Sequence, residues 1–480
     1  MTVVGPLDAM FLLGDSRRQP THVGGLMLFD LPEDAGPDHV RRVYRDTVDG
    51  QGVNPVFARR IRHRPADLGY WSWQPEPGLD LHYHVRLSEL AGPGRVRELF
   101  ELTSRLHGTV LDRHRPLWEM HLIGGVQGRR FAVYYKVHHA MIDGVSALRW
   151  MQAALSTDPH RLGMPATHAL PGHTPVPASP TGLSRAGLLT GAGQVSRSVG
   201  RAVADLAGLA PVEVRSVLHA LRAEHPAAIF QAPPTILNGP ITSARRFAAQ
   251  SWPMERLDTV RARTGATLND VVLTMCSGAL RNYLLELEAL PGKTLTAMVP
   301  VSLREPDADP ASGSSPEASS DGQSKEPGAG NSLTTILCDL ATDEPDPARR
   351  MQRVRDSTAY GKEVLSQLSP LQSLLLGALG FGVAGPAAVV PGLAGHTRPP
   401  YNLVISNVPG PVDSTLYWNR SRLLGMYPAS IVLNGQALNI SVTSYDRQLH
   451  FGLVGCPRSV PHLQRLLTHL ETSLAELERL

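Results

Sequence analysis

The residues best suited to chemistry in this chain are two adjacent histidines, followed at short spacing by an aspartate and a glycine. They stand in the run 138–144, which reads His-His-Ala-Met-Ile-Asp-Gly. A histidine ring titrates near neutral pH, so it can take a proton from a hydroxyl group as a general base. Adjacent side chains at the end of a strand point to opposite faces, so only one ring can enter a given cavity. The glycine lets the backbone turn closely beside that cavity.

The elements around this run must place it at a strand end. Residues 131–137 are apolar and aromatic, which predicts a buried strand. A second strand is predicted at 21–29, and residues 145–155 predict a helix. Two alternatives stay open for the histidines. They could be hydrogen-bonded core residues, or His139 and Asp143 could share a metal ion at helical spacing. The strand-like run before them and the lack of a nearby third ligand disfavour the metal.

The His-His-x-x-x-Asp-Gly run resembles the active-site motif of the CoA-dependent acyltransferase superfamily, and most closely that of the bacterial wax ester synthase/diacylglycerol acyltransferases. The resemblance implies that His139 is the general base and that His138 helps to orient it or simply packs. It implies a structural role for Asp143, which pairs with an arginine in the superfamily. Gly144 is expected to leave room for substrate.

Three further segments resemble motifs of the same family. Pro116-Leu117-Trp118 resembles its Pro-Leu-Trp motif and implies a substrate contact, although a buried tryptophan at the start of a strand is the plain alternative. Asn269-Asp270 resembles its Asn-Asp motif, which implies that Asn269 contacts the substrate or its reacting carbonyl. Asp270, three residues after Thr267, also fits a variant of the helix capping box.

The third segment follows a predicted strand at 402–405. Residues 406–411 resemble the family's Ser-Asn-Val-Pro-Gly-Pro loop, which implies substrate binding by Ser406, Asn407, Pro409 and Gly410. A turn that ends a strand is the structural alternative. The opening segment 6–11 also resembles the family, and Pro6 suits the first position of a helix.

The order of these segments predicts two α/β lobes, each similar to a chloramphenicol acetyltransferase unit, with an active-site tunnel between them. We expect the first lobe at 1–163, a linker and helical crossover at 164–234, and the second lobe at 235–480. The second lobe should begin with a strand at 246–252 and contain a long helix at 268–290. Residues 309–330 are almost all small or polar, which predicts a disordered loop.

Composition excludes several classes of protein. The net charge is only +3 and the basic residues are scattered, so a nucleic-acid footprint is not indicated. The three cysteines lack metal-like spacing, which favours a reduced cytoplasm. The uncharged run 374–394 raises the question of a membrane span, but its glycines and prolines favour a buried or interfacial segment. No Gly-x-Ser-x-Gly elbow or phosphate-binding glycine loop is present.

The resemblance therefore implies an O-acyltransferase that uses long-chain acyl-CoA as co-substrate and needs no metal or other cofactor. The acceptor would be diacylglycerol or a fatty alcohol, reached at the inner membrane or at lipid droplets by peripheral association. One alternative is a condensation-type or polyketide-associated acyltransferase whose donor is a carrier protein. Another is a non-catalytic protein that coats lipid droplets or membranes.

Overall fold

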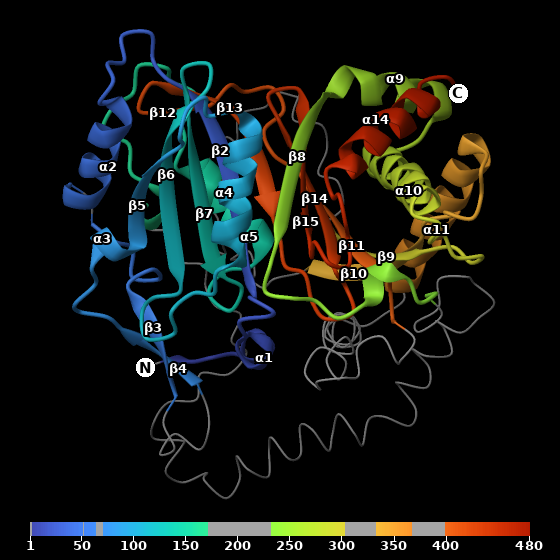
Figure 1. Cartoon of the computed structure of the whole chain (residues 1–480), viewed down its shortest axis with the longest axis horizontal. Helices are drawn as coiled ribbons and strands as arrows, with labels where there is room; N and C mark the ends of the chain where they lie inside the picture. The colour runs from blue at the N-terminus through green and yellow to red at the C-terminus, as the bar shows by residue number, and fades with distance from the viewer. Residues whose placement is uncertain (1, 51, 64–70, 171–231, 303–332, 367–398) are drawn as a thin grey trace, which may run out of the picture.

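Two six-stranded sheets stand side by side in the computed structural model, which describes residues 2–50, 52–63, 71–170, 232–302, 333–366 and 399–480 (Figure 1). Most of the expected linker and crossover lies outside these residues. So do the expected loop 309–330 and the apolar run 374–394. The mixed α/β class expected from the sequence is confirmed by the elements that follow.

The first sheet has the strand order β12-β13-β2-β7-β6-β5. Its strands are β12 (Tyr417–Trp418), β13 (Ser421–Ala429), β2 (His22–Asp30), β7 (Arg130–His138), β6 (Trp118–Val126) and β5 (Val85–Glu89). β7 is central: it pairs antiparallel with β2, where His22 lies opposite His138, and with β6. The strands predicted at 21–29 and 131–137 are confirmed as β2 and β7. The motif run therefore leaves the sheet between two neighbouring strands.

Among the described residues, the helices that accompany this sheet are α1 (Pro6–Gly14), α2 (His39–Asp49), α3 (Leu81–His84), α4 (Val96–Gly108) and α5 (Gly144–Ala153). A small sheet of β1 (Thr2–Val3), β4 (Trp71–Pro75) and β3 (Arg59–His63) lies near the N-terminus. α4 also meets the second sheet, because the hydroxyl of Ser104 accepts the amide hydrogen of Phe247 at 2.8 Å. The helices predicted from Pro6 and at 145–155 are confirmed as α1 and α5.

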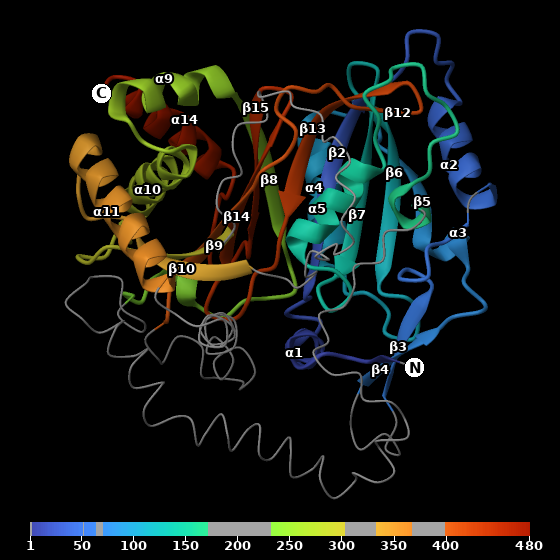
Figure 2. The ribbon, with the colours of Figure 1, turned by 180° about the vertical axis from the view of Figure 1, so that it is seen from behind.

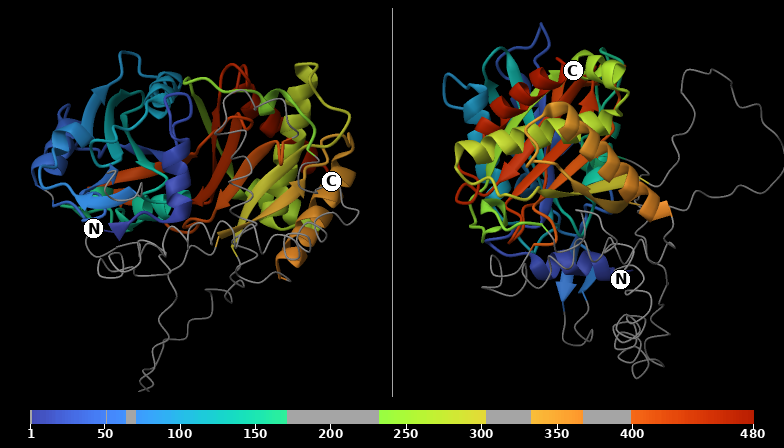
Figure 3. Two further views of the ribbon diagram at one scale, coloured as in Figure 1. Left: turned by 90° about the horizontal axis from the view of Figure 1, so that it is seen from below. Right: turned by 90° about the vertical axis from the view of Figure 1, so that its right-hand side faces the viewer.

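The second sheet has the order β10-β9-β11-β14-β15-β8. Its strands are β10 (Leu333–Asp339), β9 (Thr296–Ser302), β11 (Leu403–Val408), β14 (Leu438–Tyr445), β15 (Gln448–Gly455) and β8 (Arg246–Pro253). Four helices lie on its side away from the first lobe (Figure 3): α9 (Met254–Thr264), α10 (Leu268–Glu286), α11 (Pro347–Ser366) and α14 (Arg465–Leu477). The predicted strand at 246–252 and long helix from residue 268 are thus confirmed.

One feature of the topology is not visible in the sequence. β12 and β13 follow the second-lobe strand β11 along the chain, yet β13 pairs antiparallel with β2 at the edge of the first sheet. The backbone of β13 also closely approaches the second sheet, since a Cβ added to Gly452 in β15 would clash with the carbonyl oxygen of Pro428. The range 235–480, expected to form the second lobe, therefore supplies two strands to the first.

Candidate active site

The run 138–144 joins the end of β7 to the start of α5 and lies beside α1 (Figure 2). The strand ends here because His138 closes the register with β2, and the backbone then turns through Ala140 and Met141. The amide of Met141 donates to the carbonyl of His138 at 2.8 Å, which stabilises the turn. The two histidine rings occupy different surroundings, as expected for adjacent residues at a strand end.

His138 is packed in the interior, with 1% of its surface exposed. Its Nδ1 accepts the amide hydrogen of Ala140 at 3.1 Å, so the ring proton belongs on Nε2. Nε2 then donates to the hydroxyl oxygen of Thr21 at 3.0 Å, and that hydroxyl donates to the carbonyl of Phe11 at 2.9 Å. Both ring nitrogens are occupied, so His138 has no free lone pair with which to take a substrate proton.

His139 is partly exposed and is held differently. Its ring stacks on the Phe11 ring of α1, with centroids 4.0 Å apart and planes 19° from parallel. Its amide donates to the carbonyl of Thr21 at 3.0 Å. Burial lowers the pKa of His139 to about 4, opposed by the negative charge of Asp143 and assisted by His138. The imidazole is therefore neutral at physiological pH, which is the form that a general base requires.

Asp143 is the N-cap of α5. Its carboxylate accepts the amide hydrogen of Ser146 at 2.9 Å and the Ser146 hydroxyl at 2.7 Å. Among the residues that the structure describes, no arginine forms an ion pair with Asp143, so the arginine partner implied by the resemblance stays a prediction. The helix N-terminus supplies the stabilising donors instead. Nearby, Asp8 has its pKa raised to about 6 by burial, with Arg59 opposing the shift and Asp143 adding to it.

Gly144 is the first residue of α5. Among the described residues, a Cβ built on it would meet only a methyl group of Val23, at 3.8 Å, which is ordinary van der Waals contact. The protein itself therefore does not demand a glycine here. This agrees with the expectation that Gly144 leaves room for substrate, which stays a prediction.

The Pro-Leu-Trp segment lies inside the first lobe. Pro116, Leu117 and Trp118 are all buried. The Leu117 carbonyl accepts the amide hydrogen of His138 at 2.9 Å, so the segment fixes the end of β7. The Trp118 indole donates to the carbonyl of Phe57 at 2.8 Å. These contacts support a structural role, and the substrate contact implied by the resemblance stays a prediction.

The Trp118 indole is surrounded by other aromatic side chains. His84 and His168 both stack on its indole, at centroid distances of 4.6 and 4.8 Å. Neither Nε2 of His84 nor either ring nitrogen of His168 has a hydrogen-bond partner among the described residues. Burial lowers the pKa of His168 to about 3, with His84 adding to the shift, so this ring is neutral.

Asn269 and Asp270 lie at the start of α10 in the second lobe. The predicted capping box is present: Thr267 and Asp270 exchange side-chain to backbone hydrogen bonds at 3.2 and 3.0 Å. The second oxygen of Asp270 accepts from the hydroxyl of Thr358 in α11 at 3.0 Å. The contacts of Asp270 therefore lie within the second lobe and are structural. Asn269 is partly exposed, and its contact with substrate stays a prediction.

The loop after β11 reaches the first lobe. Ser406 and Asn407 are partly buried in β11, and Pro409 is exposed just beyond it. Gly410 exchanges hydrogen bonds with the Ser444 hydroxyl, and a Cβ added to it would lie 2.8 Å from the side-chain amide of Gln152 in α5. The structure thus brings this loop to the helix that follows the histidine motif. Substrate binding by these residues stays a prediction.

Several residues that hold the histidines are not predicted by any sequence pattern. Thr21 contacts both histidines, and Phe11 stacks on His139. Asp15 accepts from the Thr21 amide at 3.1 Å and from the Arg113 guanidinium at 3.2 Å. The only available signals are that Phe11 ends the opening segment and that Thr21 begins a predicted strand.

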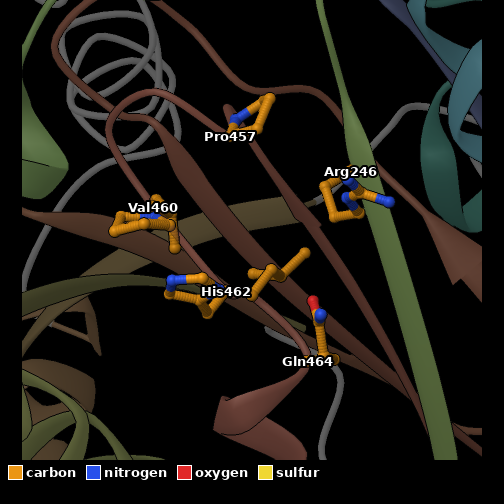
Figure 4. A pocket seen from close by; sticks show the side chains of 7 residues that line it. Arg246, Pro457, Val460, His462 and Gln464 are labelled. Carbon is orange, nitrogen blue, oxygen red and sulfur yellow. The ribbon is translucent and has the colours of Figure 1, made fainter.

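A separate cavity of about 230 Å³ lies in the second lobe (Figure 4). It is lined by Arg246, Pro457, Val460, Pro461, His462, Leu463 and Gln464. None of these residues belongs to the predicted site.

Within the described ranges, no three histidine, cysteine or acidic side chains gather as a metal site would require. No helix in those ranges is both long and apolar enough to cross a bilayer. Cys276, Cys338 and Cys456 are buried and unpaired.

Comparison with known proteins identifies the family. Residues 4–272 match the model of the wax ester synthase/diacylglycerol acyltransferase catalytic domain, and residues 329–478 match the model of the C-terminal domain of the same family. The chain belongs to this family. It is 45% identical to a Mycobacterium tuberculosis protein named as a candidate diacylglycerol O-acyltransferase, over 99% of both chains. A Mycobacterium bovis protein of similar name is 39% identical, over 97% of this chain and 89% of its own.

Solved structures agree with the family assignment. The wax ester synthase/diacylglycerol acyltransferase from Marinobacter aquaeolei VT8 superposes with a TM-score of 0.76 at 37% identity, covering 100% of this chain and 99% of its own. The first condensation domain of the calcium-dependent antibiotic synthetase has the same fold, with a TM-score of 0.57 at 17% identity over 99% and 96%. The chain is therefore an acyltransferase with the fold that the histidine motif predicts.

Proposed function

We propose that this enzyme transfers a long-chain acyl group from acyl-CoA to the hydroxyl of diacylglycerol or of a fatty alcohol, with His139 as the general base. The observation that carries the proposal is the contrast between the two histidines. His138 has both ring nitrogens engaged, whereas His139 is neutral, partly exposed and held by stacking at the end of β7. The names of the relatives at 39–45% identity supply the substrate class.

The chemistry is a direct transfer. A ring nitrogen of His139 takes the hydroxyl proton as the acceptor oxygen attacks the thioester carbonyl. The new C–O bond forms, the C–S bond breaks, and the departing CoA thiolate takes up the proton from the imidazolium. No covalent enzyme intermediate is required, because the thiolate is already a good leaving group. A general base of this kind contributes about 10²- to 10⁴-fold in rate.

The test is release of CoA thiol from palmitoyl-CoA in the presence of diacylglycerol or hexadecanol. Wild type should release thiol only with an acceptor, and His139→Ala should lower the rate by about 10²- to 10⁴-fold. His160→Ala removes an exposed histidine and is the matched control. Full activity in folded His139→Ala would overturn the mechanism. Activity with acyl carrier protein but not with acyl-CoA would overturn the assignment of the donor.

We also propose that the enzyme reaches its lipid acceptor by peripheral contact with a membrane or droplet surface. This proposal is supported by helix α1, which presents exposed apolar side chains close to the base. Phe11 of this helix stacks on His139, and Met10 and Leu13 are 39% and 68% exposed. Liposomes containing diacylglycerol should bind Leu13→Ser more weakly than wild type. Leu285→Ser, which removes an exposed leucine of the second lobe, should bind like wild type. Equal binding of Leu13→Ser and wild type would count against this surface.

A further inference from the structure

We propose that Thr21 and Asp15 are positioning residues for the base His139 and its neighbour His138, and that the second lobe holds them in place. This inference rests on the proposed role of His139 and adds residues that no motif of the sequence singles out. Thr21 and Asp15 bound the connection between α1 and β2, residues 15–21, which we call the connector.

Thr21 touches both histidines. Its hydroxyl oxygen lies 3.0 Å from Nε2 of His138, and its carbonyl accepts the amide hydrogen of His139 at 3.0 Å. The same hydroxyl donates to the carbonyl of Phe11, whose ring stacks on His139. Thr21 is 1% exposed, so water cannot replace these bonds. One residue thus fixes the backbone of His139, the tautomer of His138 and the ring that sets the plane of the base.

Asp15 adds a buried negative charge behind this arrangement. One carboxylate oxygen accepts the Thr21 amide at 3.1 Å, and the other lies 3.2 Å from Arg113 and 3.8 Å from Nε2 of His138. Burial would raise the pKa of Asp15, but His138, the Thr21 amide and Arg113 together lower it. The carboxylate is therefore ionised, and its charge favours keeping the His138 proton on Nε2, on the side that faces Thr21.

The second lobe holds the middle of the connector. The side-chain oxygen of Gln19 accepts the amide hydrogen of Asn434 at 2.8 Å, and Gln19 is only 3% exposed. The Arg245 guanidinium donates to the carbonyl of Arg18 at 2.8 Å. Both donors come from the second lobe, whereas the histidines belong to the first. The geometry of the base therefore depends on contact between the lobes.

The deciding experiment compares Thr21→Val with Thr21→Ser. Valine keeps the shape and removes the hydroxyl, so kcat should fall about 10- to 100-fold with little change in the KM for acyl-CoA, as expected for a misplaced base. Serine restores the hydroxyl and should recover most of kcat. Thr274→Val is the matched control, because it removes another buried threonine hydroxyl, which donates to the Asp270 carbonyl at 2.7 Å. It should lower Tm without lowering kcat.

Unchanged kcat in folded Thr21→Val, or no recovery in Thr21→Ser, would overturn the proposal. A second readout does not need turnover: the ¹⁵N NMR shifts of the His138 ring report its tautomer. Wild type should show the proton on Nε2, and both Thr21→Val and Asp15→Asn should shift the ring away from that pure tautomer. If wild type proves inactive with every donor, the proposed function fails and the NMR result alone decides the positioning role. An unchanged His138 spectrum in both variants would then refute it.

Discussion

At the scale of single residues, the surroundings of His139 determine how the enzyme should respond to pH. Burial lowers the pKa of its ring to about 4. The base is neutral and competent above that pH and protonated below it. We therefore expect kcat/KM to fall on the acid side with a midpoint near pH 4, measured as CoA release across a pH series.

Asp8 also titrates in this range, with a pKa raised to about 6 by burial. Asp8→Asn should therefore remove any inflection near pH 6 from the plot of kcat/KM against pH. The decrease with a midpoint near pH 4 should remain. A single acid-side transition at about pH 6.5, the ordinary value for histidine, would mean that the pKa of His139 is not lowered in the working enzyme.

The surroundings of Gly144 permit a test that distinguishes a steric conflict with substrate from an effect on folding. Because, in the part of the chain that the structure describes, an added Cβ meets only Val23 at 3.8 Å, Gly144→Ala should fold normally and keep its Tm. If the space is occupied by substrate, the methyl group should lower kcat/KM by about tenfold, through a higher KM, when acyl-CoA and acceptor are varied in turn. Unchanged kinetics would show that substrate passes elsewhere.

The residues of the site divide clearly into those that sequence predicts and those that it does not. The separation of the two histidine rings follows from strand geometry alone, and the structure confirms it. The contact between Thr21 and His138 joins residues 117 positions apart, so no local pattern could reveal it. Among the described residues the Asp143 carboxylate accepts from the amide and the hydroxyl of Ser146, three residues on, and the arginine partner implied by the resemblance stays a prediction.

At the scale of elements, the apolar periodicity of the sequence predicts the helices and strands that lie next to the candidate site. The expected helix 268–290 is α10, which stops earlier, at Glu286. The start is accurate because a capping box fixes it, whereas the C-terminal end carries no comparable sequence signal. The place of β13 could not be predicted from a local pattern, since its partner strand β2 lies about 400 residues earlier in the chain, and β12 pairs only with β13.

The same capping box supports a prediction for Asp270. Asp270→Ala removes the acceptor for Thr267 and for the buried Thr358 hydroxyl, so the free energy of unfolding should fall by about 1–3 kcal/mol in urea denaturation. kcat per folded molecule should not change. Asp258→Ala, on the exposed face of α9, is the control and should cost little. A large loss of kcat at unchanged stability would instead place Asp270 in the chemistry.

At the scale of the whole molecule, β13 ties the two sheets into one unit. It pairs with β2 in the first sheet, and its Pro428 closely approaches Gly452 in the second. Gly452→Ala should lower the free energy of unfolding by at least about 1–3 kcal/mol. The added methyl group clashes with the backbone of Pro428, and a rotamer change cannot relieve a clash with backbone. Gly292→Ala, with nothing within 4 Å of the added Cβ, should be neutral.

Because β13 joins the two sheets, we also expect the two lobes to unfold in a single transition. Trp118 lies in the first lobe and Trp252 in the second, so tryptophan fluorescence reports both lobes. Fluorescence and far-UV circular dichroism should give coincident transitions for wild type and for Gly452→Ala. Two separated transitions would show that the lobes unfold independently despite β13.

The path of β13 also limits how enzymes of this kind can recombine. An exchange of lobes between two relatives at the linker after residue 163 would leave the first sheet with an edge strand from the wrong parent. A working hybrid must carry residues 417–429 along with residues 1–163, which requires two further crossovers in the second half of the gene. We therefore expect the two halves of this protein to be inherited together, and a change of substrate preference by exchange of a whole lobe to be rare among its relatives.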